Sequence, residues 1–415
     1  MQSAVSNWQS KLNALGPGIL MATAAIGGSH LVASTQAGSL FGWQLFWLII
    51  VVNVLKYPFF RFGMEYTLAT KQSLVEGYKQ KGPGYFYSFI ALNIVAAVVN
   101  TAGVLLLTAS LLHYALPITI SVTLLCWLIL AVCLLILLLG HFKALDNVSK
   151  LIMGLLTVTT VAALIVAINN GVMNNGTAAS VDYVGSSPYE LAMLGFMVAL
   201  MGWMPAPIEI SAISSLWLKE KQHQQAVTKQ QGLFDFNLGY WLTAALALVF
   251  FSLGVLVQYG QAQAVQLGGV AFAKQLIDMY ALTMGEWARP LVSGIAFLCM
   301  FGTTLTVLDG YARTLNESHK LLSIKQSKHS LNMWLLLQAF AGMAVILFFK
   351  SALGPMLTFA MTLAFVTTPV FAWLNFSLVR SEPSIHHSPL LRTLSWLGLL
   401  YLVGFALVFL VWKVM

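Results

Sequence analysis

The stretch GPGILMATAAIGGSH, residues 16–30, carries the most information about the fold of this chain. It starts as an apolar, helix-like run and is then interrupted by Gly27, Gly28, Ser29 and His30, after which small and apolar residues resume. Such residues are costly in the middle of a hydrophobic segment unless they line a cavity, because lipid cannot satisfy freed backbone groups. Many secondary transporters build their substrate sites from helices broken in this way.

A second interruption, WMPAPIE at residues 203–209, lies in a later apolar segment. Pro205 and Pro207 supply no backbone N–H and disturb the carbonyl groups of the preceding turn. Glu209 follows them directly, where the helix has to restart. Two breaks in corresponding positions of two halves of a chain indicate a transporter.

The composition sets the class of protein. The chain has 415 residues, of which 59% are hydrophobic and 8% are charged, whereas soluble domains carry about 25% charged residues. The sequence therefore predicts an integral membrane protein whose main partner is the lipid bilayer. The net charge of +8 does not indicate nucleic acid, because the Lys and Arg residues fall in short loops. We find no nucleophile–base pattern, cofactor motif or cleavable signal peptide, and expect neither an enzyme nor a resident cofactor. Cys126, Cys133 and Cys299 are expected to be small buried residues.

Eleven apolar segments are long enough to span a bilayer, which predicts an all-α integral membrane protein with a single transmembrane domain over residues 1–415. The expected spans are 15–39, 43–68, 85–112, 116–140, 147–169, 188–217, 233–258, 288–312, 331–349, 353–378 and 392–413. The stretch 267–285 is amphipathic, and we expect a surface helix or an extension of the eighth span there.

Lysine and arginine set the expected orientation. With the N-terminus in the cytoplasm, 17 of the 21 Lys and Arg residues, Lys56 among them, fall on the cytoplasmic side. Lys274, Arg289, Lys350 and Lys413 fall outside. This bias predicts a multi-pass protein of the cell (inner) membrane with a cytoplasmic N-terminus and an external C-terminus.

Ionisable residues inside the apolar segments are functional candidates, because a charge at the helix centre is costly in lipid. Glu209 beside freed carbonyl groups predicts a cation-friendly site. His30 has two interpretations that the sequence leaves open: a metal ligand or proton carrier, or a histidine that holds the break together by bonding Ser29 or Glu209. Two further carboxylates are expected in structural pairs four residues from an arginine. These pairs are Arg61 with Glu65 and Asp309 with Arg313, while Asp235 lies at a span entrance.

The span-1 segment at residues 16–43, with Gln36 and Gly38 after the break and Gly42 before Trp43, resembles the first span of the Nramp family of divalent-metal transporters. GHFKALDNVSKLI, residues 140–152, is similar to that family's loop into span 5. The resemblance implies a LeuT-type fold with inverted repeats at 15–169 and 188–378, to which 392–413 is added. It also implies proton-coupled uptake of manganese, iron or related ions by a monomer.

The chain departs from this family at the site itself. The family's metal-binding Asp in span 1 falls on Gly27, and the Asn of the same motif falls on His30. In span 6, the methionine that favours soft transition metals falls on Ala206, with Pro207 in register and Glu209 at the end of the motif. The resemblance therefore implies the scaffold of a metal transporter without its usual ligands.

Three functions remain open at this point. The first is an Nramp-like secondary transporter of a divalent cation (Mg, Mn or Fe class) with altered selectivity. It would work by alternating access, with a proton as a possible coupling ion. The second keeps the fold and moves a small zwitterion or organic acid. The third, a sensor or assembly protein that has lost its site, fits less well because polar residues persist at both breaks. The candidate substrate-binding residues are Gly27, Gly28, Ser29, His30, Ala206, Pro207 and Glu209, with Glu209 and His30 as the metal-ligand and proton-coupling candidates.

Overall fold

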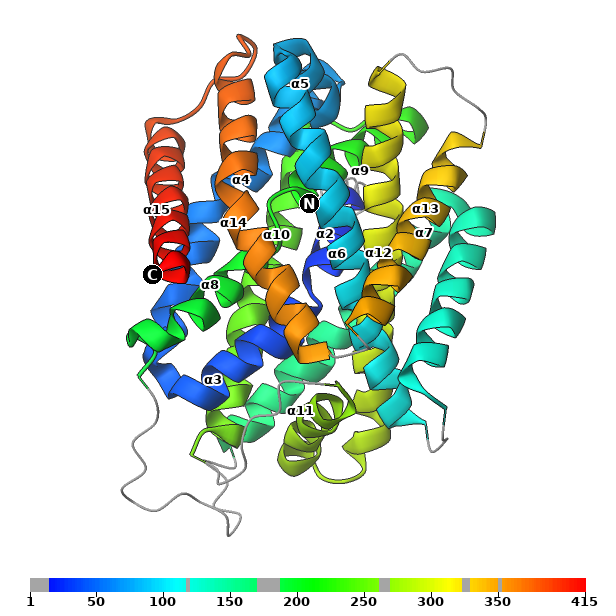
Figure 1. Ribbon diagram of the computed structural model, residues 1–415, viewed down its shortest axis with the longest axis vertical. Helices are drawn as coiled ribbons and strands as arrows, with labels where there is room; N and C mark the ends of the chain where they lie inside the picture. The colour runs from blue at the N-terminus through cyan, green and yellow to red at the C-terminus, as the bar shows by residue number, and fades with distance from the viewer. Residues whose placement is uncertain (1–14, 117–119, 170–186, 261–268, 323–328, 350–352) are drawn as a thin grey trace, which may run out of the picture.

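The computed structural model describes residues 15–116, 120–169, 187–260, 269–322, 329–349 and 353–415, and these parts of the chain are all-helical. The helices stand roughly side by side as one bundle (Figure 1). The long helices are α4 (Phe46–Thr70), α6 (Pro83–Ala115), α7 (Val122–Asn169), α10 (Lys229–Leu253), α12 (Ala288–Leu321), α13 (Ser330–Phe348), α14 (Leu353–Arg380) and α15 (Pro389–Val414).

The structure is compatible with the number of spans expected from the sequence. Within the described residues, nine helical stretches are long and apolar enough to cross a membrane, two of them inside the single helix α7. Two further segments, Pro17–Phe41 and Leu191–Gln224, are each built from shorter helical pieces. Together they fit the eleven spans expected. The division into two inverted repeats stays a prediction.

The first break is confirmed. Helix α2 (Pro17–Ala25) has its proline in the first turn, where a missing N–H costs nothing, and it ends before Gly27. A π-helical turn, η1 (Ser29–Ser34), follows and leads into α3 (Thr35–Phe41). Such turns are rare and frequently mark functional sites. The Ser34 hydroxyl donates to the Ser29 carbonyl at 3.2 Å, so a polar residue of this segment serves the backbone of the turn.

The second break is confirmed as well. Helix α8 (Leu194–Trp203) stops one residue before the prolines, and α9 (Ile210–Gln224) begins directly after Glu209. The intervening residues are buried and non-helical, as two prolines in one turn require. Helix α8 also packs closely on α14, since a Cβ atom at Gly202 would lie 2.0 Å from the Met361 carbonyl oxygen.

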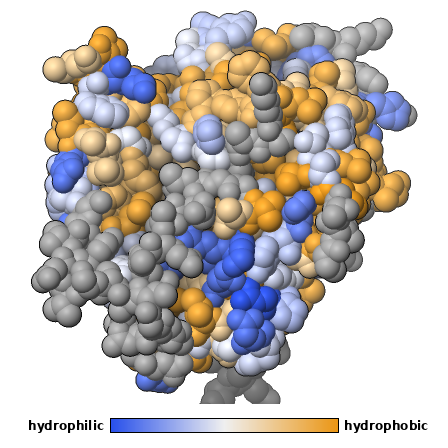
Figure 2. Space-filling model, turned by 60° about the horizontal axis from the view of Figure 1, so that its bottom comes forward, coloured by the Kyte–Doolittle hydropathy of each residue, from blue (hydrophilic) through white to orange (hydrophobic). Residues whose placement is uncertain are grey.

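Short helices cover the two ends of the bundle. Helix α5 (Leu74–Lys81) lies at one end, and α11 (Gly269–Met284) lies at the other (Figure 1). The amphipathic stretch is thus a separate helix, whose Lys274 forms an ion pair with Asp278. With the α11 end turned forward, hydrophilic residues gather in patches between broad hydrophobic areas (Figure 2).

The outer helices present apolar side chains to the surroundings, as lipid contact requires. Val158 on α7 is 71% exposed and Leu400 on α15 is 73% exposed. All of α2 is buried, and so is nearly all of the second half of α8. The two broken segments therefore lie inside a ring of lipid-facing helices.

Several smaller expectations are confirmed. Arg61 Nε lies 2.8 Å from Glu65 Oε1, and Arg313 Nε lies 2.8 Å from Asp309 Oδ2. Both carboxylates are therefore held in intrahelical ion pairs. The three cysteines are free thiols in buried positions.

Candidate functional site

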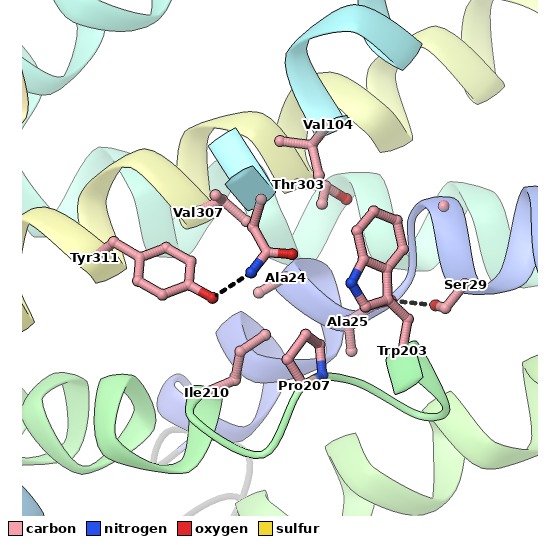
Figure 3. Close-up of a pocket in the computed structure, with 12 residues that line it drawn as sticks. Ala24, Ala25, Ser29, Val104, Trp203, Pro207, Ile210, Thr303, Val307 and Tyr311 are labelled. Atoms are coloured by element: carbon pink, nitrogen blue, oxygen red, sulfur yellow. Dashed lines mark hydrogen bonds between the residues drawn. The ribbon is translucent and has the colours of Figure 1, made fainter. Parts of the chain in front are cut away.

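A small cavity lies between the two breaks (Figure 3). Its volume of about 20 Å³ is enough for roughly one water molecule. Five elements converge on it: α2 and its break, α6, α8, the start of α9, and α12. The residues that line it are Ala24, Ala25, Gly28, Ser29, Asn100, Val104, Trp203, Pro207, Ile210, Thr303, Val307 and Tyr311.

A polar triad of Glu209, Tyr311 and Asn100 lies at this cavity. The Tyr311 hydroxyl donates to Glu209 Oε1 at 3.0 Å, and Asn100 Nδ2 donates to the Tyr311 oxygen at 2.8 Å. Asn100 Nδ2 also lies 3.5 Å from Glu209 Oε1. Tyr311 and Asn100 line the cavity, whereas the Glu209 carboxylate lies behind them and is 1% exposed. Its second oxygen, Oε2, has no hydrogen-bond partner among the described residues, and a buried acceptor of this kind is costly to leave unpaired.

The Trp203 indole forms the opposite wall and points into the cavity (Figure 3). It packs on the backbone of the first break, because a Cβ atom at Gly28 would lie 2.4 Å from Trp203 Cζ3. Glycine is therefore needed at this position for the two breaks to meet. The indole Nε1–H is buried and finds no acceptor in the described parts of the chain.

Helix α12 places polar side chains beside the carbonyl groups that the first break frees, although one hydroxyl hydrogen of Thr303 can serve only one of them at a time. The Thr303 hydroxyl lies 2.9 Å from the Thr23 carbonyl oxygen and 3.0 Å from that of Ile26. The Cys299 thiol lies 3.2 Å from the same Ile26 oxygen. Side chains of α12 thus lie against the carbonyl oxygens that an unwound helix would otherwise offer to a cation.

At the second break, an ammonium group donates hydrogen bonds to the freed carbonyl groups. Lys56 is completely buried in α4, and its Nζ donates to the carbonyls of Met201 at 2.6 Å and Gly202 at 3.0 Å. The Ala206 carbonyl lies 3.5 Å from the same Nζ. Our assignment of Lys56 to the cytoplasmic surface is wrong, because the ends of a broken helix can satisfy a buried ammonium as water would. Lys56 also interacts electrostatically with Glu209.

His30 points away from Glu209 and toward α10. Its Nε2 lies 2.9 Å from the Thr243 carbonyl oxygen, which can only accept, so Nε2 carries the hydrogen. Its Nδ1 lies 2.6 Å from the Ser29 hydroxyl oxygen. Of the two structural partners expected for His30, the structure therefore pairs it with Ser29, and Thr243 is an additional partner.

Asp235 holds the start of the first broken helix. Its Oδ1 accepts from the Gly16 backbone N–H at 3.0 Å, and its Oδ2 accepts from the Gly18 N–H at 2.7 Å. A carboxylate at a helix N-terminus is favoured by the partial positive charge there. Asp235, which the sequence placed at a span entrance, thus caps the N-terminus of α2.

The structure brings some of the predicted site residues together and separates others. Gly28, Ser29 and Pro207 line the cavity, and Glu209 reaches it through Tyr311. Gly27 packs against Thr303, His30 turns to α10, and Ala206 offers its carbonyl to Lys56. Among the described residues, no three His, Cys, Asp or Glu side chains converge as a metal-binding group.

Sequence reasoning missed several residues of the site. These are Lys56, Asn100, Trp203, Thr303 and Tyr311. Lys56 carried a usable signal, since a charge inside an apolar span is a functional candidate by default. Asn100, Thr303 and Tyr311 carried none, because single polar residues in long helices are common and only the packing of α6 and α12 brings these three to the cavity.

Comparison with known proteins agrees with this architecture. A crystal structure of a variant of the manganese transporter of Eremococcus coleocola matches with a TM-score of 0.70 and 15% identity, over 97% of this chain and 86% of that chain. Mhp1, a nucleobase-cation-symport-1 family transporter in a closed conformation with bromovinylhydantoin bound, matches with a TM-score of 0.61 and 14% identity, over 87% and 77%. Both are membrane transporters rather than enzymes. No protein-family model matches the sequence.

The chain is thus an integral membrane protein with the LeuT-type fold of secondary transporters, in which two broken helices surround a central cavity. An uncharacterized protein of Pasteurella multocida is 53% identical over 408 residues, which cover 97% of this chain and 93% of that protein. The chain belongs to the same family as this Pasteurella protein.

Proposed function

We propose that this protein is a secondary transporter of a small organic solute that can both donate and accept hydrogen bonds, such as a zwitterion. The observation that carries the proposal is a pair of unsatisfied groups, one on a residue that lines the cavity and one directly behind its polar wall. Trp203 Nε1 is a buried donor without an acceptor, and Glu209 Oε2 is a buried acceptor without a donor. A bare metal ion would satisfy the carboxylate only, whereas a solute with both kinds of group satisfies the indole as well.

The charges at the breaks support a solute without a net positive charge. Lys56 supplies one positive charge and Glu209 one negative charge when both are ionised. A divalent cation would add two further positive charges to a dry interior, where uncompensated charge is expensive. The carbonyls of Met201 and Gly202, which the second break frees, already accept from Lys56 and are not open to such an ion.

A divalent cation is the second candidate, and the free Glu209 Oε2 favours it. The ligand set would be Glu209, Asn100 and Ser29 with water, which suits a partly hydrated hard ion. The likeness to a manganese transporter and to a transporter with bromovinylhydantoin bound is compatible with either class of substrate.

Proton coupling is part of the proposal, with His30 as the proton site and Glu209 as the alternative. The Ser29 hydroxyl lies 2.7 Å from the Ala25 carbonyl oxygen and 2.6 Å from His30 Nδ1. One hydroxyl hydrogen cannot serve both acceptors, whereas a protonated imidazole would donate to the Ser29 oxygen and complete the network. The bilayer is expected to be the cell membrane and the working unit a monomer.

The cavity holds about one water molecule, which is less space than a zwitterion needs. Uptake requires the α2 and α8 sides to move apart, as alternating access does around a fixed site.

A thermal-unfolding screen of the purified protein in detergent tests the proposal. It compares a panel of amino acids and small organic acids with Mg²⁺, Mn²⁺, Fe²⁺, Cd²⁺ and Ca²⁺. A ligand at about 100 times its dissociation constant should stabilise the fold by about 2.7 kcal/mol. Three variants accompany the parent protein: Trp203→Phe removes the indole N–H, Glu209→Gln removes the charge, and Trp127→Phe on the outer face of α7 is the matched control.

We expect stabilisation by an organic solute that is lost in Trp203→Phe and Glu209→Gln and kept in Trp127→Phe. Stabilisation by one metal ion, lost in Glu209→Gln but kept in Trp203→Phe, would replace the proposal with the second candidate. A solute effect that both site variants retain would place the binding site elsewhere.

A further inference from the structure

A second cavity, of about 370 Å³, lies at the opposite end of the bundle from α11, where the loop between α14 and α15 meets α4. It is far larger than the central cavity and more polar. Its basic and polar lining residues are Arg380 at the end of α14, His386 and His387 in the loop, and Arg392 and Ser395 on α15, with Trp396 beside them. None of these residues belongs to the central site.

The cavity has more positive than negative charge. The guanidinium of Arg380 lies 5.9 Å from the centre of the Trp396 ring, and no ion pair joins Arg380 or Arg392 to a carboxylate within the described residues. Two carboxylates lie nearby: Glu65 is paired with a cation, whereas Glu382 accepts from a neutral hydroxyl group. Glu65 pairs with Arg61 at 2.8 Å, and Glu382 accepts from the Ser384 hydroxyl at 2.7 Å.

Burial and the neighbouring charges together set the pKa of His387. Burial lowers its pKa below the ordinary value, Glu65 opposes the shift, and the positive charges of Arg61, Arg392 and Lys229 lower the pKa further. Its Nδ1 lies 3.4 Å from Glu65 Oε2, the acidic group that partly offsets these charges. An anion in the cavity would relieve the same unfavourable interactions.

We propose that this cavity binds the phosphate of an anionic membrane lipid through Arg380 and Arg392. Guanidinium groups match phosphate oxygens in geometry as well as charge. The first turn of α15 adds the partial positive charge of a helix N-terminus. Ser388 caps that turn by accepting from the Leu391 N–H at 3.3 Å, which fixes Arg392 within the first turn.

A lipid is the favoured source of the phosphate because the cavity adjoins the lipid-facing surface. On α15, Trp396 is 47% exposed, Leu397 is 50% exposed and Leu400 is 73% exposed. Acyl chains can lie on these side chains while the headgroup enters the cavity. The distribution of Lys and Arg assigns this end of the bundle to the cytoplasmic leaflet, where basic pockets between helices bind anionic headgroups.

Native mass spectrometry and thermal unfolding of the full chain test this proposal. The protein is delipidated and exposed to phosphatidylglycerol, to phosphatidylcholine, or to inorganic phosphate without lipid. The test variants are Arg380→Gln, Arg392→Gln and the double variant. Lys71→Gln is the control, because Lys71 is an exposed basic residue at the same end of the bundle and outside the cavity.

We expect phosphatidylglycerol adducts and a raised unfolding temperature for the parent protein and Lys71→Gln. The apparent affinity should fall by about tenfold for each arginine removed. If the double variant does not fold, the single variants and the comparison of the two lipids on the parent protein still decide the question.

Equal binding of phosphatidylcholine and phosphatidylglycerol would overturn the proposal. Equal retention of phosphatidylglycerol by the parent protein and both single variants would overturn it as well. Saturable stabilisation by inorganic phosphate, lost in the same variants while lipid has no effect, would keep the phosphate site and overturn the lipid as its source.

Discussion

The Nζ atom of Lys56 lies 2.6 Å from the carbonyl oxygen of Met201, although the two residues are 145 positions apart. This contact places a cation of the protein at the end of α8, where breaking the helix has freed the carbonyl groups. The same ammonium also reaches Gly202. A side chain of α4 therefore stabilises the break in the second helix by donating hydrogen bonds to its free carbonyl groups.

Replacing Lys56 by methionine should destabilise the protein strongly. The change leaves the carbonyls of Met201 and Gly202 unpaired and Glu209 without its positive neighbour. A hydrogen bond that involves a charged group contributes about 1.5–3 kcal/mol, and Lys56 donates to both carbonyls. The expected result is a clear fall in the unfolding temperature in detergent, whereas Lys71→Met at the exposed C-cap of α4 should be nearly neutral.

Replacing Lys56 by alanine distinguishes the effect of its charge from the effect of its volume. Lys56→Ala leaves a space beside the freed carbonyls, and added ammonium or an alkylammonium ion should restore part of the lost stability. Restoration by a neutral alcohol of the same size, and not by the cation, would show that Lys56 acts by filling volume rather than by its charge.

Gly28→Ala should disturb the cavity without unfolding the chain. The new methyl group would lie 2.4 Å from Trp203 Cζ3, so the indole has to move. Overpacking of this kind costs about 1–3 kcal/mol. Gly404→Ala on α15 is the control, because a Cβ atom there meets nothing within 4 Å. The measurement is the thermal stabilisation by the ligand found in the screen, because the fluorescence of Trp203 cannot be separated from that of the other tryptophans among the 12 in the chain. Gly28→Ala should abolish this stabilisation, and Gly404→Ala should keep it.

Asp235→Asn should weaken the attachment of α2 to α10. The carboxylate accepts from Gly16 and Gly18 with separate oxygens, and the amide would turn an N–H₂ group toward one of these donors. A hydrogen bond to a charged group contributes about 1.5–3 kcal/mol. The measurement is the unfolding temperature, together with hydrogen exchange of the α2 amides. Unchanged protection of α2 in the variant would mean that the cap does not hold this helix.

The link between α5 and α9 should weaken in acid. Burial alone would raise the pKa of Glu76, but hydrogen bonds from Lys219 and Ser73 outweigh it and hold the pKa below its ordinary value of 4.5. A lowered pKa means that Glu76 stabilises the folded state above that value, and that the contribution is lost as the pH falls through the folded-state pKa. The parent protein should therefore unfold at a higher temperature than Glu76→Gln at neutral pH, and the difference should shrink below about pH 4.5. A difference that stays constant as the pH falls well below 4.5 would assign the effect to the shape of the side chain rather than to its charge.

The membrane class and both helix breaks could be predicted from the amino-acid sequence alone. These features follow from local chemistry: apolar runs of sufficient length, two glycines before Ser29 and His30, and two prolines before Glu209. The intrahelical pairs of Arg61 with Glu65 and of Asp309 with Arg313 were predictable for the same reason, since helical spacing alone places them together.

The side chains that meet at the breaks could not be predicted, because they depend on how distant helices pack. Asn100 and Tyr311 reach Glu209 from two other helices, and Lys56 reaches the end of α8 from a third. These partners are separated from the breaks by about a hundred residues or more along the chain, so no local pattern encodes them. A broken helix frees donors and acceptors that any neighbour can satisfy, and only the packing of the bundle determines which neighbour does so.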